Sequence, residues 1–179
     1  GLNALVDLDE EQSRRDAHAS SLRWAEGRPR GVLDGAPIAV KANIAVAGRA
    51  WTAALMGLKD RVSANDAQVV SRLRAAGAVL IGVANMHEGA RGATTTSPLY
   101  GQAFSPLRAG HTPGGSSGGS TAAVAAGLCA GALGSDTLGS VRIPSAYCGV
   151  YGFKPSFGAV SRRGVELLSW SLDHVGFHG

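Results

Sequence analysis

Short apolar runs alternate with segments of helical periodicity along most of the chain, and this pattern predicts the order of its elements. Residues 36–44, 78–84 and 131–136 are rich in Ile, Val, Ala and Leu and are bounded by turn-forming residues, which is typical of buried strands. Residues 149–154 predict a fourth strand or an extended segment. Apolar strands that alternate with helices indicate an α/β fold whose sheet is covered by helices on both faces.

The first predicted helix spans residues 8–26, where charged and apolar positions alternate at helical spacing. Asp9 suits its start, and Gly27 suits its end. We expect the inner face of this helix to consist of its spaced apolar residues, Leu8, Ala17, Leu22 and Trp24.

Three further segments favour helix. Residues 64–66 suit the start of a helix that Gly77 ends. Residues 118–130 are small and apolar and predict a closely packed helix, and residues 141–147 predict a helical turn. Residues 85–113 are rich in Gly, Pro, Thr and Ser and are expected to be mostly loop.

Length and composition indicate one folded domain. A chain of 179 residues with 45% hydrophobic content is long enough for one hydrophobic core but too short for two domains of ordinary size. No stretch of eighteen apolar residues predicts a transmembrane helix, and the acidic start does not resemble a signal peptide. We therefore expect a soluble, cytoplasmic protein. The chain begins with Gly1 rather than Met, which leaves processing, a tag remnant or a fragment open.

The net charge of +4 comes mainly from scattered arginines that are not interleaved with aromatic residues, which argues against a nucleic-acid-binding surface. Cys129 and Cys148 lie in apolar surroundings and predict buried, reduced thiols. Their spacing matches no zinc motif, and the five histidines do not cluster with them.

Lys41 is a candidate for chemistry because it lies at the end of an apolar run that includes Ile38, Val40 and Ile44. Burial disfavours the charged amine and lowers its pKa, and a neutral amine is a competent general base. The alternative is a lysine that extends its ammonium group to water from a strand end.

Two clusters of Gly and Ser flank the Ala-rich helix, and the first spans residues 114–119. It is not a Walker phosphate-binding loop, because no lysine precedes its Ser or Thr. The cluster formally fits the nucleophile-elbow pattern G-x-S-x-G with Ser116 at its centre. That interpretation would require His174 or His178, near the end of the chain, as the base.

The second cluster, residues 134–140, is a glycine-containing turn that ends at Ser140. Its successive backbone N–H groups can converge on a developing oxyanion. Asp136 and Arg142 are expected to pair across this turn and to fix its shape.

These motifs, in this order, resemble the amidase signature family. The resemblance rests on Lys41 in Ala-Val-Lys-Ala-Asn-Ile, on Gly-Gly-Ser-Ser-Gly-Gly-Ser, and on residues 135–145, with support from residues 85–88, 152–158 and 171–176. It extends from about residue 31 onward and implies a mixed sheet covered by helices on both faces. Family domains continue beyond this point, so we expect residues 1–179 to be one incomplete domain, with a helical region (1–30) before the catalytic core (31–179).

The resemblance also implies a Ser–cis-Ser–Lys triad. Ser140 resembles the nucleophile, Ser116 the bridging serine after a cis peptide bond from Gly115, and Lys41 the base. The implied oxyanion and substrate-binding residues are Thr137, Leu138, Gly139 and Ala90, and the implied supporting residues are Ser117, Asp136 and Arg142. Ala42 stands where the family commonly has Asp, and Leu138 where it commonly has Gly.

The implied activity is hydrolysis of a carboxamide to an acid and ammonia or an amine through a serine acyl-enzyme, without a metal or cofactor. The implied partner is a small-molecule amide, with neither nucleic acid nor membrane, and a homodimer is left open. Two alternatives remain: a truncated, catalytically impaired remnant of an amidase, and a glutamine-hydrolysing subunit of an amidotransferase.

Overall fold

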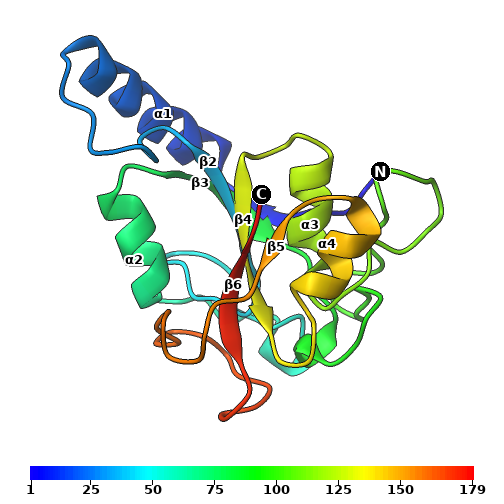
Figure 1. The fold of residues 1–179 in the computed structure, drawn as a ribbon. Coiled ribbons are helices and arrows are strands. Elements are labelled where there is room, and N and C mark those ends of the chain that lie inside the picture. Colours follow the sequence, from blue (N-terminus) through cyan, green and yellow to red (C-terminus); the bar gives the residue numbers. More distant parts are fainter.

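A six-stranded mixed sheet forms the centre of the protein, which a computed structural model describes over all of residues 1–179 (Figure 1). The strand order is β1-β3-β2-β4-β6-β5. The elements in chain order are β1 (Leu5–Leu8), α1 (Glu10–Ala25), β2 (Pro37–Lys41), the 3-10 helix η1 (Met56–Leu58), α2 (Gln68–Ala75), β3 (Val79–Ala84), the 3-10 helix η2 (Glu88–Ala90), α3 (Gly118–Ala125), β4 (Gly131–Asp136), α4 (Arg142–Cys148), β5 (Gly152–Phe153) and β6 (His174–His178).

The middle of the sheet is parallel and its margins are antiparallel. Strand β2 pairs in parallel with β3 and with β4, whereas β1, β6 and β5 join in antiparallel pairs. Because parallel strands end at the same edge of a sheet, the last residues of β2 and β4 emerge on the same side. Those residues are Lys41 and Asp136, so two candidate site residues are brought to one edge.

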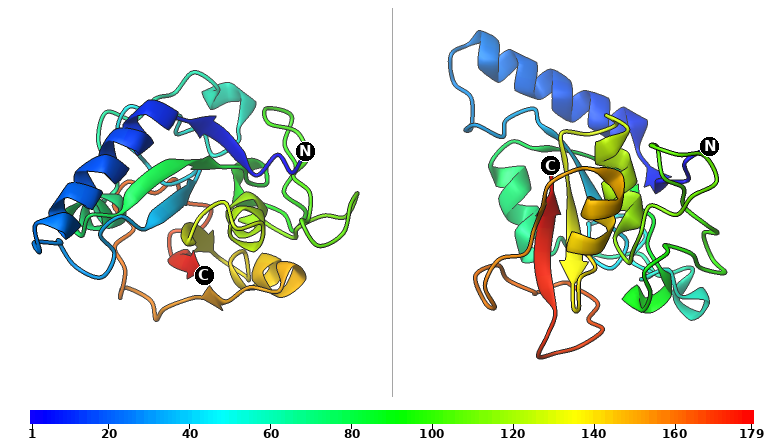
Figure 2. Two further views of the ribbon diagram at one scale, coloured as in Figure 1. Left: turned by 90° about the horizontal axis from the view of Figure 1, so that it is seen from above. Right: turned by 45° about the vertical axis from the view of Figure 1, so that its right-hand side comes forward.

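Helices cover both faces of the sheet, as the alternation of apolar strands and helices predicts. Figures 1 and 2 show α2 on one side of the sheet and α3 with α4 on the other. Ile38 and Val40 of β2 share a buried apolar cluster with Val70 of α2. Ala39 of β2 instead packs in the cluster that contains Ala122 of α3, because successive strand residues face opposite sides.

Helix α1 has the predicted position but not the predicted face. Asp9 caps it by accepting a hydrogen bond from the Gln12 N–H at 2.9 Å. The apolar residues expected inside are exposed, and Ser20 is the only buried residue of the helix. The exposed residues are Leu8, Ala17, Leu22 and Trp24. No helix of the protein combines the length and the apolar character needed to cross a membrane.

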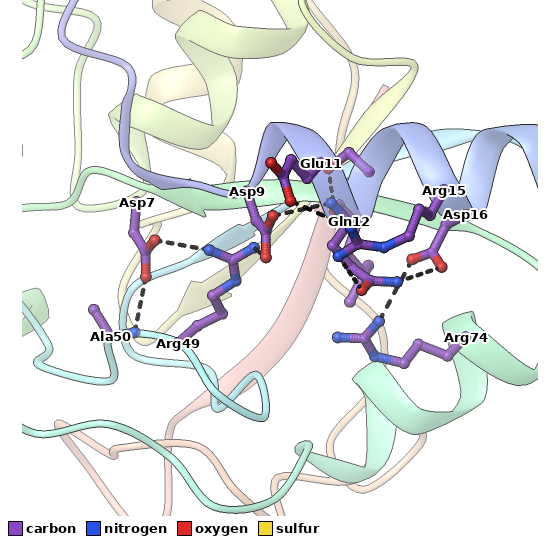
Figure 3. A network of polar contacts seen from close by, with 11 residues as sticks. Asp7, Asp9, Glu11, Gln12, Arg15, Asp16, Arg49, Ala50 and Arg74 are labelled. Carbon is purple, nitrogen blue, oxygen red and sulfur yellow. Dashed lines mark hydrogen bonds and ion pairs between the residues drawn. The ribbon is translucent and has the colours of Figure 1, made fainter.

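Polar contacts, rather than an apolar face, hold the start of α1 on the protein (Figure 3). Arg49, in the loop after β2, pairs with Asp7 at 3.1 Å and with Asp9 at 2.7 Å. Asp7 also accepts a hydrogen bond from the Ala50 N–H at 2.9 Å. The helix therefore lies beside the sheet through charged groups, which explains why apolar periodicity misassigned its inner face.

Two strands were not predicted, and several elements are shorter than predicted; strand β2, for example, ends at Lys41 rather than at Ile44. Strand β1 adds residues from the expected helical region (1–30) to the sheet edge, and β6 lies where the end of the chain was given no structure. Helix α3 ends at Ala125 rather than near Ala130, because Gly127 takes a left-handed conformation (φ +70°) and its N–H bonds the Val124 carbonyl. The segment 149–154 contributes only the two residues of β5.

Helix α3 packs at Gly119 directly against the backbone before β1 and after β3, and this close contact leaves no room for a side chain. A Cβ atom at Gly119 would collide with the Asn85 carbonyl oxygen and would lie 2.6 Å from the Ala4 carbonyl oxygen, and neither backbone group can move away easily. Gly119→Ala should lower the free energy of unfolding by about 1–3 kcal/mol. Urea denaturation measures this loss.

Gly57→Ala is the matched control, because nothing lies within 4 Å of a Cβ atom at that position. Its free energy of unfolding should stay within about 0.5 kcal/mol of the parent. Equal losses in the two variants would show that the Gly119 contact is not the constraint.

Candidate active site

The Lys41 amine is buried at the end of the central strand β2. Its side chain is fully inaccessible to solvent, which excludes the alternative of an amine that reaches water. The Nζ atom lies 2.7 Å from Ser116 Oγ and 2.9 Å from Ser135 Oγ, with the Ser135 carbonyl oxygen at 3.4 Å. All the hydrogen-bond partners of this amine are therefore neutral oxygen atoms.

Removal from water dominates the protonation of this amine. Burial lowers the pKa of Lys41 to about 7, against smaller opposing effects of the negative charges of Asp173 and Asp136. Ala42, which follows the lysine, is buried and brings no charge of its own. Near neutral pH the amine is thus divided between its protonated and neutral forms.

Ser116 lies in the Gly/Ser loop before α3, and the peptide bond from Gly115 to Ser116 is cis. The loop is held closely against residues 92–94: a Cβ atom at Gly115 would lie 2.8 Å from the Thr94 nitrogen. Thr95 donates its hydroxyl to the Gly114 carbonyl at 2.7 Å, and the Ser116 carbonyl accepts the His87 N–H at 3.0 Å. Backbone contacts on both sides therefore fix the position of the Ser116 hydroxyl.

Asp136 organises the turn that carries Ser140. Its carboxylate accepts the backbone N–H groups of Gly139 at 2.8 Å and Val141 at 3.1 Å, and it pairs in a bidentate manner with Arg142 at 3.0 and 3.1 Å. Burial acts to raise the pKa of Asp136, but the hydrogen bonds from Arg142 and Val141 outweigh it and the pKa lies below its usual value. The predicted pairing of Asp136 with Arg142 is present in the structure.

The backbone N–H groups of this turn are not equivalent. Those of Thr137, Leu138 and Ser140 have no acceptor in the protein, whereas that of Gly139 already donates to Asp136. Gly139 is therefore not a free donor, contrary to the expectation that it would serve an oxyanion. Its φ of +133° is instead a left-handed conformation that favours glycine.

A surface cavity of about 310 Å³ opens beside Ser140. The Ser140 hydroxyl makes no hydrogen bond to the protein, and its carbonyl accepts the Ser117 N–H at 3.1 Å. Leu138, which is 81% exposed, stands at the cavity rather than filling it. Residues from η2, from the first Gly/Ser loop, from the turn that carries Ser140 and from α4 line this cavity: Ala90, Gly115, Thr137, Leu138, Ser140 and Ile143.

Ser117 and His178 lie behind the site. Ser117 donates its hydroxyl to the Ser135 carbonyl at 3.2 Å, so it braces the first Gly/Ser loop against β4. His178 is buried in β6, with Nδ1 at 3.0 Å from the Thr121 hydroxyl and 2.9 Å from the Ser145 hydroxyl, and burial lowers its pKa to about 3. Neither His178 nor His174 contacts Ser116, and so the nucleophile-elbow interpretation has no base.

Sequence reasoning assigned no role to Ser135 or Asn43, although both stand inside the motifs that it quoted. Asn43 donates its amide to Ser135 Oγ at 3.0 Å and to the Glu166 carbonyl at 3.1 Å. The spacing of Asn43 two residues after Lys41 was visible in the sequence, but its contact with β4 was not.

Groups that could hold a metal are not assembled anywhere in the structure, since no three His, Cys, Asp or Glu side chains come together. Cys129 and Cys148 are free and buried, as predicted. Burial raises the pKa of the Cys129 thiol to about 11, which makes it a poor nucleophile.

Comparison with known proteins places this geometry in context. The family model described as Amidase matches residues 1–179. A glutamyl-tRNA(Gln) amidotransferase subunit from Methanothermobacter thermautotrophicus is 43% identical over 175 residues, which cover 98% of this chain and 38% of that relative.

Solved structures agree with this match. The native peptide amidase from Stenotrophomonas maltophilia superposes with a TM-score of 0.93 at 38% identity, over 99% of this chain and 37% of that one. The corresponding glutamyl-tRNA(Gln) amidotransferase subunit from Thermotoga maritima gives 0.81 at 38% identity, over 95% and 41%. The chain spans about two fifths of the length of the relatives it matches.

The buried amine predicts a specific dependence of stability on pH. The folded-state pKa of Lys41 is about 7 and lies below the ordinary value of 10.5, so between these pH values the unfolded chain binds more protons. Relative to Lys41→Met, the parent should therefore gain stability with rising pH, by up to about 1.4 kcal/mol per pH unit.

Urea denaturation of both proteins from pH 6 to pH 10 measures this difference. Below pH 7 the amine is protonated in both states, and the difference between parent and variant should become constant. A difference that does not change with pH would contradict the lowered pKa of Lys41.

Proposed function

This chain belongs to the amidase family, and we propose that it carries a site that hydrolyses a carboxamide C–N bond through an acyl-enzyme on Ser140. The observation that carries the proposal is the 2.7 Å contact between the buried Lys41 amine and the Ser116 hydroxyl. An amine with a pKa of about 7 is a base matched to neutral pH.

Proton transfer in this proposal runs through Ser116. Neutral Lys41 accepts the proton of the Ser116 hydroxyl while Ser116 accepts the proton of Ser140, and the Ser140 oxygen bonds to the amide carbonyl carbon. The proton then returns along the same groups to the amide nitrogen as the C–N bond breaks and ammonia or an amine leaves. Water attacks the resulting ester by the same relay, which releases the acid and regenerates Ser140.

The free N–H groups of Thr137, Leu138 and Ser140 are the proposed donors to the oxyanion. Fixed donors in a partly dry site stabilise the negative charge of the tetrahedral intermediate without reorganisation. Asp136 keeps the turn in place by holding the neighbouring N–H groups of Gly139 and Val141. Thr137 is held further by a hydrogen bond from its hydroxyl to Asp173.

The proposed substrate is a small-molecule amide whose acyl part enters the cavity beside Ser140. Ala90, Leu138 and Ile143 give that cavity apolar surface close to the hydroxyl. The three side chains of the relay account for every proton that the reaction moves, and so the proposal assigns no step to a metal or cofactor.

A second candidate substrate is glutamine. It is favoured by the relatives named as glutamyl-tRNA(Gln) amidotransferase subunits, which are 41–45% identical to this chain. In that case the ammonia would pass to another protein of the same complex. Release of ammonia from glutamine, but not from simple amides, would favour this candidate.

The first prediction of the proposal concerns the nucleophile. Ser140→Ala should lower amide hydrolysis by about 10⁴-fold or more, because acyl transfer loses its attacking oxygen. A fluorophosphonate probe should label the parent at Ser140 and leave the variant unlabelled. Hydrolysis retained by Ser140→Ala would sink the assignment, and an unlabelled parent would favour the catalytically impaired remnant.

Ser120→Ala is the control for these measurements. Ser120 is a buried serine of α3 whose hydroxyl donates to the Leu133 carbonyl at 2.9 Å, away from the relay. Its removal should leave both hydrolysis and labelling near the parent level.

The second prediction concerns pH. Because only neutral Lys41 can accept a proton, kcat/KM should be constant above pH 7 and fall about tenfold per pH unit below it. Initial rates with one amide from pH 5 to pH 9 test this. A rate that does not decline at acidic pH would rule out a lysine base with this pKa.

A further inference from the structure

The surroundings of the Lys41 amine contain more acceptors than proton transfer to Ser116 alone requires. Besides Ser116 Oγ, the Nζ atom contacts Ser135 twice, at its hydroxyl (2.9 Å) and at its carbonyl (3.4 Å). A neutral amine has two N–H groups and one lone pair. The lone pair must face Ser116 for the proposed transfer, and so both N–H groups must find acceptors elsewhere.

Asn43 determines how the Ser135 hydroxyl is used. The Glu166 carbonyl can only accept a hydrogen bond, so the nitrogen side of the Asn43 amide must face it, at 3.1 Å. The same nitrogen lies 3.0 Å from Ser135 Oγ and therefore donates to it. The opposite atom, Asn43 Oδ1, is buried without a partner, which is consistent with an amide oriented from its nitrogen side.

We propose that Ser135, held by Asn43, is a positioning residue that orients the Lys41 amine so that its lone pair faces the Ser116 hydroxyl. The inference rests on the proposed function, in which Lys41 is the base. Ser135 supplies an acceptor for each N–H group of the neutral amine, and Asn43 occupies the other lone pair of its hydroxyl oxygen. After proton transfer the ammonium donates to the same two oxygen atoms and to Ser116, so the Ser135 hydroxyl need not turn.

Other charged and titratable groups influence the protonation of Lys41, but substitutions at Ser135 and Asn43 leave these groups in place. The negative charges of Asp136 and Asp173 favour its protonated form. Burial lowers the pKa of His87 and of His178, and the nearby charge of Lys41 acts in the same direction on both. Differences between variants at Ser135 and the parent therefore report the Ser135 contacts.

Ser135→Ala tests the inference through two quantities, the pKa of Lys41 and the plateau value of kcat/KM. A loss of packing alone would not change both together. Without the hydroxyl the ammonium loses an acceptor, so the pKa of Lys41 should fall and the acid limb of kcat/KM should move to lower pH. The plateau rate above that limb should drop roughly tenfold to hundredfold, less than loss of the whole general base would cost, because Lys41 itself remains. The control Ser120→Ala removes an equally buried hydroxyl and should move neither.

Asn43→Asp should shift the acid limb of kcat/KM in the opposite direction, to higher pH. Its carboxylate cannot donate to Ser135, and its negative charge favours the ammonium, so the limb should move to higher pH while the plateau rate falls. If this variant does not fold, Asn43→Ala removes the donor without adding charge and should lower the plateau rate by itself.

The pKa of Lys41 can also be followed without activity, from the pH dependence of the free energy of unfolding of Ser135→Ala. A pKa of Lys41 unchanged from the parent would overturn the role of Ser135, whatever the rates are. Hydrolysis retained by Ser140→Ala would instead overturn the proposed function, so the two failures are distinguishable.

Discussion

The burial of one amine is the constraint on which the rest of this site depends. Lys41 ends the central strand β2 with no exposed surface and with only neutral oxygen atoms around its Nζ atom. Such an environment penalises the ammonium and gives the free amine a population at neutral pH. The sheet makes this burial feasible, because β3 and β4 flank β2 on both sides and helices cover both of its faces.

Two glycine- and serine-rich segments are brought to this amine by close backbone packing rather than by large side chains. Gly119 lets α3 approach the carbonyl of Asn85, and Gly115 lets the Ser116 loop approach residues 92–94. The turn that carries Ser140 is instead held by the Asp136 carboxylate, which accepts hydrogen bonds from the backbone N–H groups of Gly139 and Val141. The proposed relay therefore rests on close backbone packing at Gly115 and Gly119 and on the Asp136 carboxylate at the Ser140 turn.

Periodicity predicted the elements that bury apolar side chains and failed for those that do not. Strands β2, β3 and β4 and helix α2 were predicted because apolar clusters leave a direct trace in the sequence. The predicted inner face of α1 was wrong, because salt bridges from Arg49 to Asp7 and Asp9 hold the start of that helix in place of an apolar contact. Strand β6 was missed because His178 reads as polar, although the Thr121 and Ser145 hydroxyls make its burial tolerable.

The sequence by itself determined which residue types the site contains: a lysine in an apolar strand, two serine-bearing turns and an acid–arginine pair. These are local features, and each leaves its mark within a few neighbouring positions. The resemblance implied that Lys41 and Ser116 act together. Only the tertiary structure decided that Ser135 also contacts the Lys41 amine, that Gly139 donates its N–H to Asp136, and that Asn43 donates to Ser135. Hydrogen bonds between distant segments are directional, and no one-dimensional pattern encodes their direction.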